Sequence, residues 1–107
     1  MASDAQEKIG RLQMIEQNLQ AMLGQKQQFQ SQAFEIESAL KELQTTTDAY
    51  KIVANLMIKT DKTKLVEDLT QKKEIADLRI KSMEKQEEQL REKAESLRKD
   101  VLASMKE

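Results

Sequence analysis

The side chains of this sequence that could carry out acid, base or metal chemistry are almost all charged. Its 107 residues include 18 Lys and Arg and 19 Asp and Glu, but neither histidine nor cysteine. Histidine is the usual proton carrier near neutral pH and, with cysteine, a leading metal ligand. The sequence also has no glycine-rich phosphate loop and no Ser/His/Asp set. We therefore expect no catalysis, no metal and no cofactor.

Composition argues against several kinds of partner. The net charge of −1 gives no basic field that would attract nucleic acid or an anionic membrane surface, and no apolar run approaches the length of a membrane span. We expect a cytoplasmic protein that binds neither, with nucleic-acid binding as a distant alternative. The absence of proline, together with 35% charged residues, is typical of long, solvent-exposed helices.

Apolar residues recur at alternating spacings of three and four along both halves of the chain, which is the pattern of coiled-coil helices. One such seam starts at Ala5 and reaches Thr47, and the other starts at Lys62 and reaches Ser104. We expect helices over residues 4–46 and 63–106. Thr63 is the expected N-cap of the second helix.

The residues between the two helices favour strands. Thr45-Thr46-Thr47 is a β-branched run that weakens helix propensity, and the stretch from Tyr50 to Thr60 is rich in strand-forming residues. We expect a hairpin over residues 50–59, with strands 50–53 and 56–59 and a turn at Ala54-Asn55. Because alanine tolerates a positive φ poorly, a longer loop is the alternative.

The two seams match each other when the chain is folded back at Ala54-Asn55. This shared centre favours an antiparallel pair within one chain over a parallel dimer. The predicted fold class is mainly α, a long antiparallel two-helix coiled coil joined by a central β-hairpin. The register brings Lys26 diagonally within reach of Glu87, and we interpret this pair as a lock on the register. The alternative is that both side chains bend out to solvent.

The expected hairpin has apolar side chains on both faces, more than one covering helix could bury. An isolated hairpin is at best marginally stable, and its free edges need partners. We predict that these side chains drive oligomerisation, and the alternative is that the hairpin packs on its own helices. The candidate oligomerisation residues are Tyr50, Ile52, Val53, Leu56, Met57 and Ile58.

Two blocks of the sequence, AYKIVANLMIKTDKTKLVEDLTQKKE (49–74) and RIKSMEKQEEQLREK (79–93), resemble the archaeal β class of the prefoldin family, hexameric chaperones whose arms hold unfolded proteins. One departure is Ala54, where members commonly have glycine. The resemblance implies a single subunit over residues 1–107, whose hairpin joins others in a β-barrel body of an oligomer. It implies a prefoldin α subunit as partner, in a ratio of two α to four β, with a β-only assembly as the open alternative.

The resemblance also implies a function, that of an ATP-independent holdase that captures unfolded client proteins with its coiled-coil tips and delivers them to a group II chaperonin. The alternative is a structural coiled-coil spacer or adaptor that binds one folded partner. Apolar residues leave the seam near both termini, and fraying at Gly10 would expose seam residues there. The alternatives to client contact are ordinary scatter of surface apolar residues and contact with a neighbouring arm. The candidate client-binding residues are Ile9, Leu12, Met14, Ile15, Leu23, Leu97, Val101, Leu102 and Met105.

Overall fold

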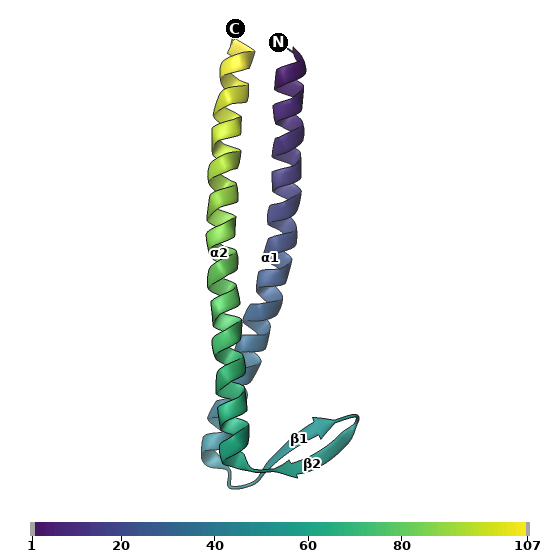
Figure 1. Cartoon of the computed structure of the whole chain (residues 1–107), viewed down its shortest axis with the longest axis vertical. Coiled ribbons are helices and arrows are strands. Elements are labelled where there is room, and N and C mark those ends of the chain that lie inside the picture. Colours follow the sequence, from purple (N-terminus) through teal and green to yellow (C-terminus); the bar gives the residue numbers. More distant parts are fainter. Residues whose placement is uncertain (1, 107) are drawn as a thin grey trace. The chain divides into compact units, whose positions relative to one another are not determined.

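The computed structural model describes residues 2–106 and the side-chain exposure of residues 4–105. Its elements are, in order, helix α1 (Ala2–Thr45), strand β1 (Ala49–Val53), strand β2 (Leu56–Thr60) and helix α2 (Lys62–Lys106) (Figure 1). The predicted fold class of two long helices with a central antiparallel hairpin is confirmed. α1 begins two residues before the expected position and ends one residue before it, and α2 begins one residue early.

The start of α2 is capped by Asp61 and not by Thr63, so the predicted N-cap is wrong. Asp61 Oδ1 accepts a hydrogen bond of 3.1 Å from the backbone N–H of Thr63. The Asp61 carbonyl accepts the first helical bond, 3.0 Å from the N–H of Leu65. A carboxylate is favoured at this position because it also meets the positive end of the helix dipole.

Contacts between residues divide the chain into two compact units, which are described separately. Unit 1 is formed by residues up to Gln27 together with residues from Lys81 onward, and unit 2 runs from Gln28 to Ile80. Each unit therefore contains a segment of α1 and a segment of α2. Unit 2 also contains the hairpin.

The predicted seams are the buried sides of the helices in both units. Every seam position from Ala5 to Leu43, and from Lys62 to Val101, is half-buried or buried. Thr47 and Ser104, the last positions of the two seams, are exposed. Those two predictions are wrong because Thr47 lies beyond the last residue of α1 and Ser104 lies in the final turn of α2.

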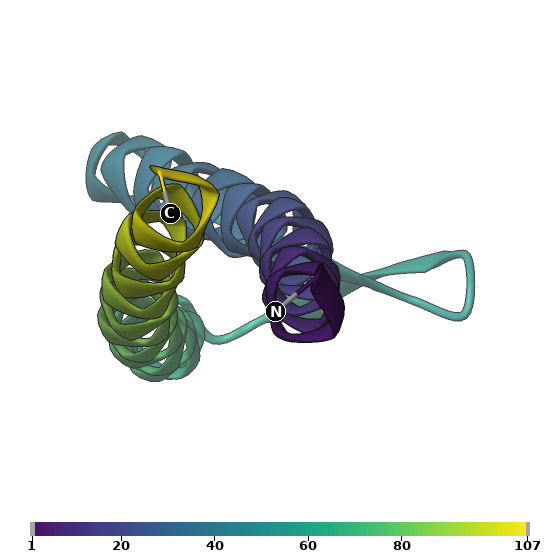
Figure 2. The same ribbon diagram turned by 90° about the horizontal axis from the view of Figure 1, so that it is seen from above.

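The helices of unit 1 run antiparallel. Residues with higher numbers in α1 pair with residues of lower number in α2. Figures 1 and 2 show the two segments next to each other. Three ion pairs join these segments: Lys8 with Asp100 (3.9 Å), Glu16 with Arg98 (3.3 Å) and Lys26 with Glu87 (3.1 Å).

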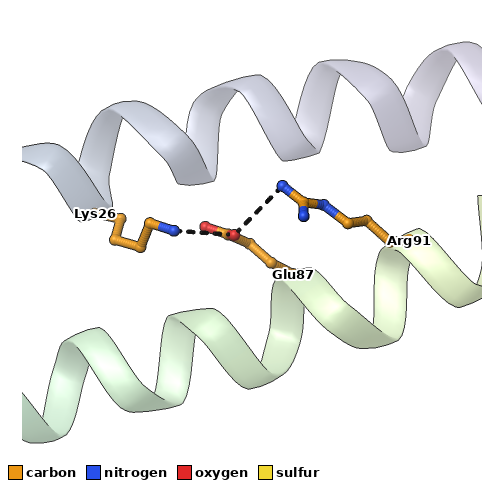
Figure 3. A network of polar contacts seen from close by, with 3 residues as sticks. All are labelled: Lys26, Glu87 and Arg91. Atoms are coloured by element: carbon orange, nitrogen blue, oxygen red, sulfur yellow. Dashed lines mark hydrogen bonds and ion pairs between the residues drawn. The ribbon is translucent and has the colours of Figure 1, made fainter.

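The third of these pairs lies inside the seam (Figure 3). Lys26 Nζ donates a hydrogen bond of 3.1 Å to Glu87 Oε2, and the side chains are 16% and 7% exposed. Arg91, one turn along α2, places its guanidinium 3.8 Å from the same oxygen. Within the described residues, Glu87 Oε1 is buried without a hydrogen-bond partner. The pair predicted from the register therefore forms, and the alternative that both side chains reach solvent is wrong.

Unit 2 holds its two helix segments together differently. The Arg79 guanidinium of α2 lies over the Phe29 ring of α1, 5.3 Å from the ring centre, which is within cation–π range. Near the hairpin, Lys62 Nζ donates a hydrogen bond of 2.8 Å to the carbonyl of Thr46. This bond ties the start of α2 to the segment that follows α1.

We predict that Lys26→Met lowers the free energy of unfolding by roughly 2–4 kcal/mol, because removing one partner of a buried pair leaves the other charge desolvated. Lys8→Met is the matched control. Its pair with Asp100 is 35% and 54% exposed, so the loss should stay below about 1 kcal/mol. Urea unfolding followed by circular dichroism measures both, and equal losses would contradict the prediction.

The lock itself is tested by replacing both partners, Lys26→Met with Glu87→Leu. An apolar pair of similar volume should restore stability but remove the penalty on a shifted register. Disulfide trapping reads the register, with cysteines at positions 19 and 90 for the expected pairing and at 19 and 97 for a shift of one heptad. The lock is unnecessary if the shifted pair stays untrapped in the double variant.

Candidate functional site

The hairpin of unit 2 presents two apolar faces. Its strands pair antiparallel, with Ile52 opposite Met57 and Val53 opposite Leu56. Because alternate residues of a strand point to opposite faces, this register assigns three apolar side chains to each face. One face has Tyr50, Ile52 and Met57, and the other has Val53, Leu56 and Ile58.

All six of these side chains are exposed, and the most open are Ile52 (72%) and Met57 (71%). Only Ala49, at the base of β1, is buried. The hairpin extends away from the helix segments of unit 2 in both views (Figures 1 and 2). The alternative that the hairpin packs on its own helices is therefore wrong for the chain by itself.

A two-residue turn sets the shape of the hairpin, as the sequence predicted. Ala54 and Asn55 have φ values of 49° and 66°. Positive φ at both central residues is the property of a type I′ turn, whose twist matches that of the paired strands. Asparagine accepts this conformation readily, whereas alanine is strained in it because its Cβ approaches the backbone. The longer loop does not form.

The candidate client-binding residues all lie in unit 1 but fall into two groups. Five are exposed, from Leu23 (40%) to Met105 (73%). The other four occupy the seam and are half-buried or buried in the closed helix pair. The exposed residues are Ile9, Met14, Leu23, Leu102 and Met105, and the seam residues are Leu12, Ile15, Leu97 and Val101.

The exposed group does not form one face. Ile9, Leu23 and Met105 take heptad position e and Leu102 takes position b, which lie on the same side of a helix pair. Met14 takes position c on the other side, where it borders a groove of about 550 Å³ between the helices of unit 1. Ile15 and Leu97, from the seam group, also line that groove.

The groove has basic residues at its margins. Arg11 of α1 and Lys93 of α2 line it together with Leu90, and both cations are exposed. Arg11 Nη2 lies 3.5 Å from Glu7 Oε1, in a pair whose members are both about two-thirds exposed. Such a pair contributes little, so it leaves the guanidinium available to another carboxylate.

A second, acidic groove of about 470 Å³ runs along α2 in unit 1. Four exposed glutamates line it beside the buried Glu87 and its neighbour Arg91. They are Glu84, Glu88, Glu92 and Glu95. Within residues 2–106, no group of three or more His, Cys, Asp or Glu residues is arranged to hold a metal ion. Over the same residues, neither helix has the length of apolar sequence needed to cross a membrane.

Comparison with known proteins assigns the chain to a family. The sequence matches the prefoldin subunit family over residues 6–107. The chain belongs to the prefoldin family. The resemblance of the sequence to this family is thereby confirmed.

Individual relatives agree with this assignment. The prefoldin subunit beta of Archaeoglobus fulgidus is 40% identical over 88 residues, covering 79% of this chain and 76% of the relative. That of Thermococcus onnurineus is 34% identical over 101 residues, covering 92% and 87%. The crystal structure of the prefoldin beta subunit from Thermococcus strain KS-1 superposes with a TM-score of 0.88 at 33% identity, covering 94% of this chain and 91% of that one.

Sequence reasoning missed several residues of the prefoldin surfaces described above. The groove of unit 1 includes Arg11 and Lys93, which lie at the g positions that flank a seam, where the sequence analysis proposed no site. In unit 2, three large apolar side chains outside the hairpin are also exposed. Like the apolar residues near the termini, they are apolar residues at helix positions outside the seam. That pattern could have identified them from the sequence. They are Phe34, Ile75 and Leu78.

We predict that Ala54→Gly stabilises the hairpin. It removes a strain of about 1–2 kcal/mol at the positive φ, against about 0.4–1 kcal/mol from the greater freedom of glycine in the unfolded chain. Amide hydrogen exchange at Val53 and Leu56, the hydrogen-bonded pair that flanks the turn, should slow by roughly two- to fivefold. Ala39→Gly, at an exposed position of α1, is the control and should weaken the helix by about 1 kcal/mol. Unchanged or faster exchange in Ala54→Gly would refute the prediction.

Proposed function

We propose that this chain is a subunit of a cytoplasmic, ATP-independent chaperone, a holdase that captures unfolded proteins and delivers them to a group II chaperonin. The observation that carries the proposal is the set of exposed apolar side chains in unit 1, in a member of the prefoldin family. Exposed apolar side chains can bind the apolar segments that an unfolded protein leaves uncovered. The closed seam residues Leu12, Ile15, Leu97 and Val101 join this surface in the proposal when the helix ends fray.

The proposed working form is an assembly with a prefoldin α subunit, in a ratio of two α to four β. Apolar side chains on both faces of the hairpin support it, because a chain that leaves Ile52 and Met57 more than two-thirds exposed requires cover from other chains. In the assembly these faces are buried in a β-barrel body. Assembly then uses unit 2, and client capture uses unit 1.

Capture by several copies of unit 1 explains how a holdase can work without a nucleotide. Each copy offers a few side chains, so each contact is weak and dissociates readily. Several copies on one client raise the overall affinity through their effective concentration. Met14 and Met105 suit varied clients because an unbranched thioether adapts to many shapes. Release of the client then requires no nucleotide.

The test replaces together the four exposed candidate residues nearest the two termini in sequence, Ile9→Ser, Met14→Ser, Leu102→Ser and Met105→Ser, in the full chain assembled with an α subunit. Affinity for denatured clients should fall roughly tenfold or more, since each change removes apolar contact area. Light scattering measures the aggregation of several unrelated denatured proteins at equimolar ratio. Native mass spectrometry checks that the assembly is intact.

Phe34→Ser, Ile75→Ser and Leu78→Ser together form the matched control, because they remove exposed apolar side chains from unit 2. This variant should suppress aggregation as well as the unaltered protein. Equal loss in both variants would mean that the site lies elsewhere. If the unaltered assembly suppresses the aggregation of no client, the holdase proposal fails and the structural adaptor becomes the better account.

A further inference from the structure

We propose that the groove of unit 1 selects client segments in which apolar side chains stand next to a carboxylate. The inference rests on the proposed holdase function and adds a chemical preference to it. It concerns the groove on the Met14 side of the helix pair, between Arg11 on α1 and Lys93 on α2.

The floor of the groove is apolar. Ile15, Leu90 and Leu97 are half-buried seam residues, so part of each side chain faces the groove, and Met14 stands 63% exposed beside them. The volume of about 550 Å³ is within the range of roughly 300–1,000 Å³ that small-ligand sites use. That space suits a few side chains of an extended or partly helical segment, and not the surface of a folded partner.

The charge around this floor has one sign. Arg11 and Lys93 are the ionisable residues that line the groove, and the two polar lining residues, Asn18 and Ser96, are uncharged. The exposed Glu7 that pairs with Arg11 is not among the lining residues. A bound segment therefore meets two cations and no opposing carboxylate within the groove.

The acidic groove on α2 contrasts with the groove between Arg11 and Lys93. The chain as a whole is close to neutral, yet the two grooves of unit 1 differ in charge, because four exposed glutamates line one and two cations line the other. The glutamate-lined groove repels an acidic segment, while the Arg11–Lys93 groove attracts it. The occupant that charge complementarity selects is an apolar segment with one or two carboxylates, provided by a non-native polypeptide.

The size of the preference follows from the exposure of both cations. Exposed ion pairs are individually weak, so two of them should favour an acidic segment over a basic one by about three- to tenfold in Kd. The preference should disappear at about 1 M salt, where the screening length is about 3 Å. Apolar binding should persist there, because burial of apolar surface does not depend on charge attraction.

The test uses the full chain assembled with an α subunit and three fluorescein-labelled peptides. The peptides share a leucine-containing sequence and carry Glu, Gln or Lys at the same two flanking positions. Fluorescence anisotropy should give the tightest Kd for the Glu peptide and the weakest for the Lys peptide. Arg11→Gln with Lys93→Gln should bring the three values together while leaving the Gln peptide unchanged.

Lys85→Gln with Lys99→Gln is the matched control. It removes the same charge from exposed positions of unit 1 on the outer side of α2, so the order of the three peptides should stay the same. Equal binding of all three peptides by the unaltered assembly overturns the inference. So does a preference that survives Arg11→Gln with Lys93→Gln, or one that both double variants abolish, since that would be a general effect of net charge.

Two further readouts separate the possible failures. If the Arg11 and Lys93 changes alter the mass of the assembly, the groove is occupied by another subunit and the inference is wrong. If the unaltered assembly suppresses client aggregation but binds the three peptides alike, the holdase proposal survives and only the charge preference fails. If it does neither, the holdase proposal fails as well.

Discussion

A two-stranded hairpin with apolar side chains on both faces cannot be covered by the chain that forms it. This is the constraint on which the proposed biology of the molecule depends. The type I′ turn at Ala54-Asn55 fixes the pairing of Ile52 with Met57 and of Val53 with Leu56, and this register distributes the apolar residues over both faces. Of the apolar residues in the strands, Ala49 is buried and the six larger ones are exposed. In the proposed assembly, other subunits supply the cover.

Unit 1 also has little apolar core of its own. Its helix pair buries only a few residues, among them Ala94 with its small side chain and the polar Glu87. An ion pair inside such a thin core is a poor source of stability, because desolvation offsets much of its attraction. It does penalise any register that leaves Glu87 unpaired. We infer that helix pairing in unit 1 depends on apolar seam residues for stability, with Lys26 and Glu87 as the hypothesised lock on the register.

Much of this fold could be predicted because its information is local and periodic. The alternation of three and four residues identified the buried side of both helices, and the common centre of the two seams identified the turn. The Lys26–Glu87 contact followed from that register without any knowledge of side-chain conformations. Errors occurred where the pattern ends. Thr47 continues the heptad arithmetic although α1 has stopped, and Asp61 takes the cap expected of Thr63.

The surfaces were harder to predict than the fold. Heptad arithmetic separates seam from surface but does not show how long side chains enclose a groove, so Arg11 and Lys93 looked like any solvated cations. It also grouped Met14 with Ile9, Leu23 and Met105 because all leave the seam near the termini. The heptad positions place Met14 on the other side of the helix pair. Grooves depend on side chains from two helices at once, and a pattern along one helix does not contain that information.

The central proposal is that the hairpin is the point of assembly, and native mass spectrometry of the chain co-expressed with a prefoldin α subunit tests it. The predicted result is a complex of two α and four β chains that is lost with Ile52→Ser and Met57→Ser on one face, or with Val53→Ser and Ile58→Ser on the other. Lys51→Ser, an exposed polar change in β1, should leave it intact. A monomer in the presence of the α subunit, or a complex that survives both double changes, would contradict the account.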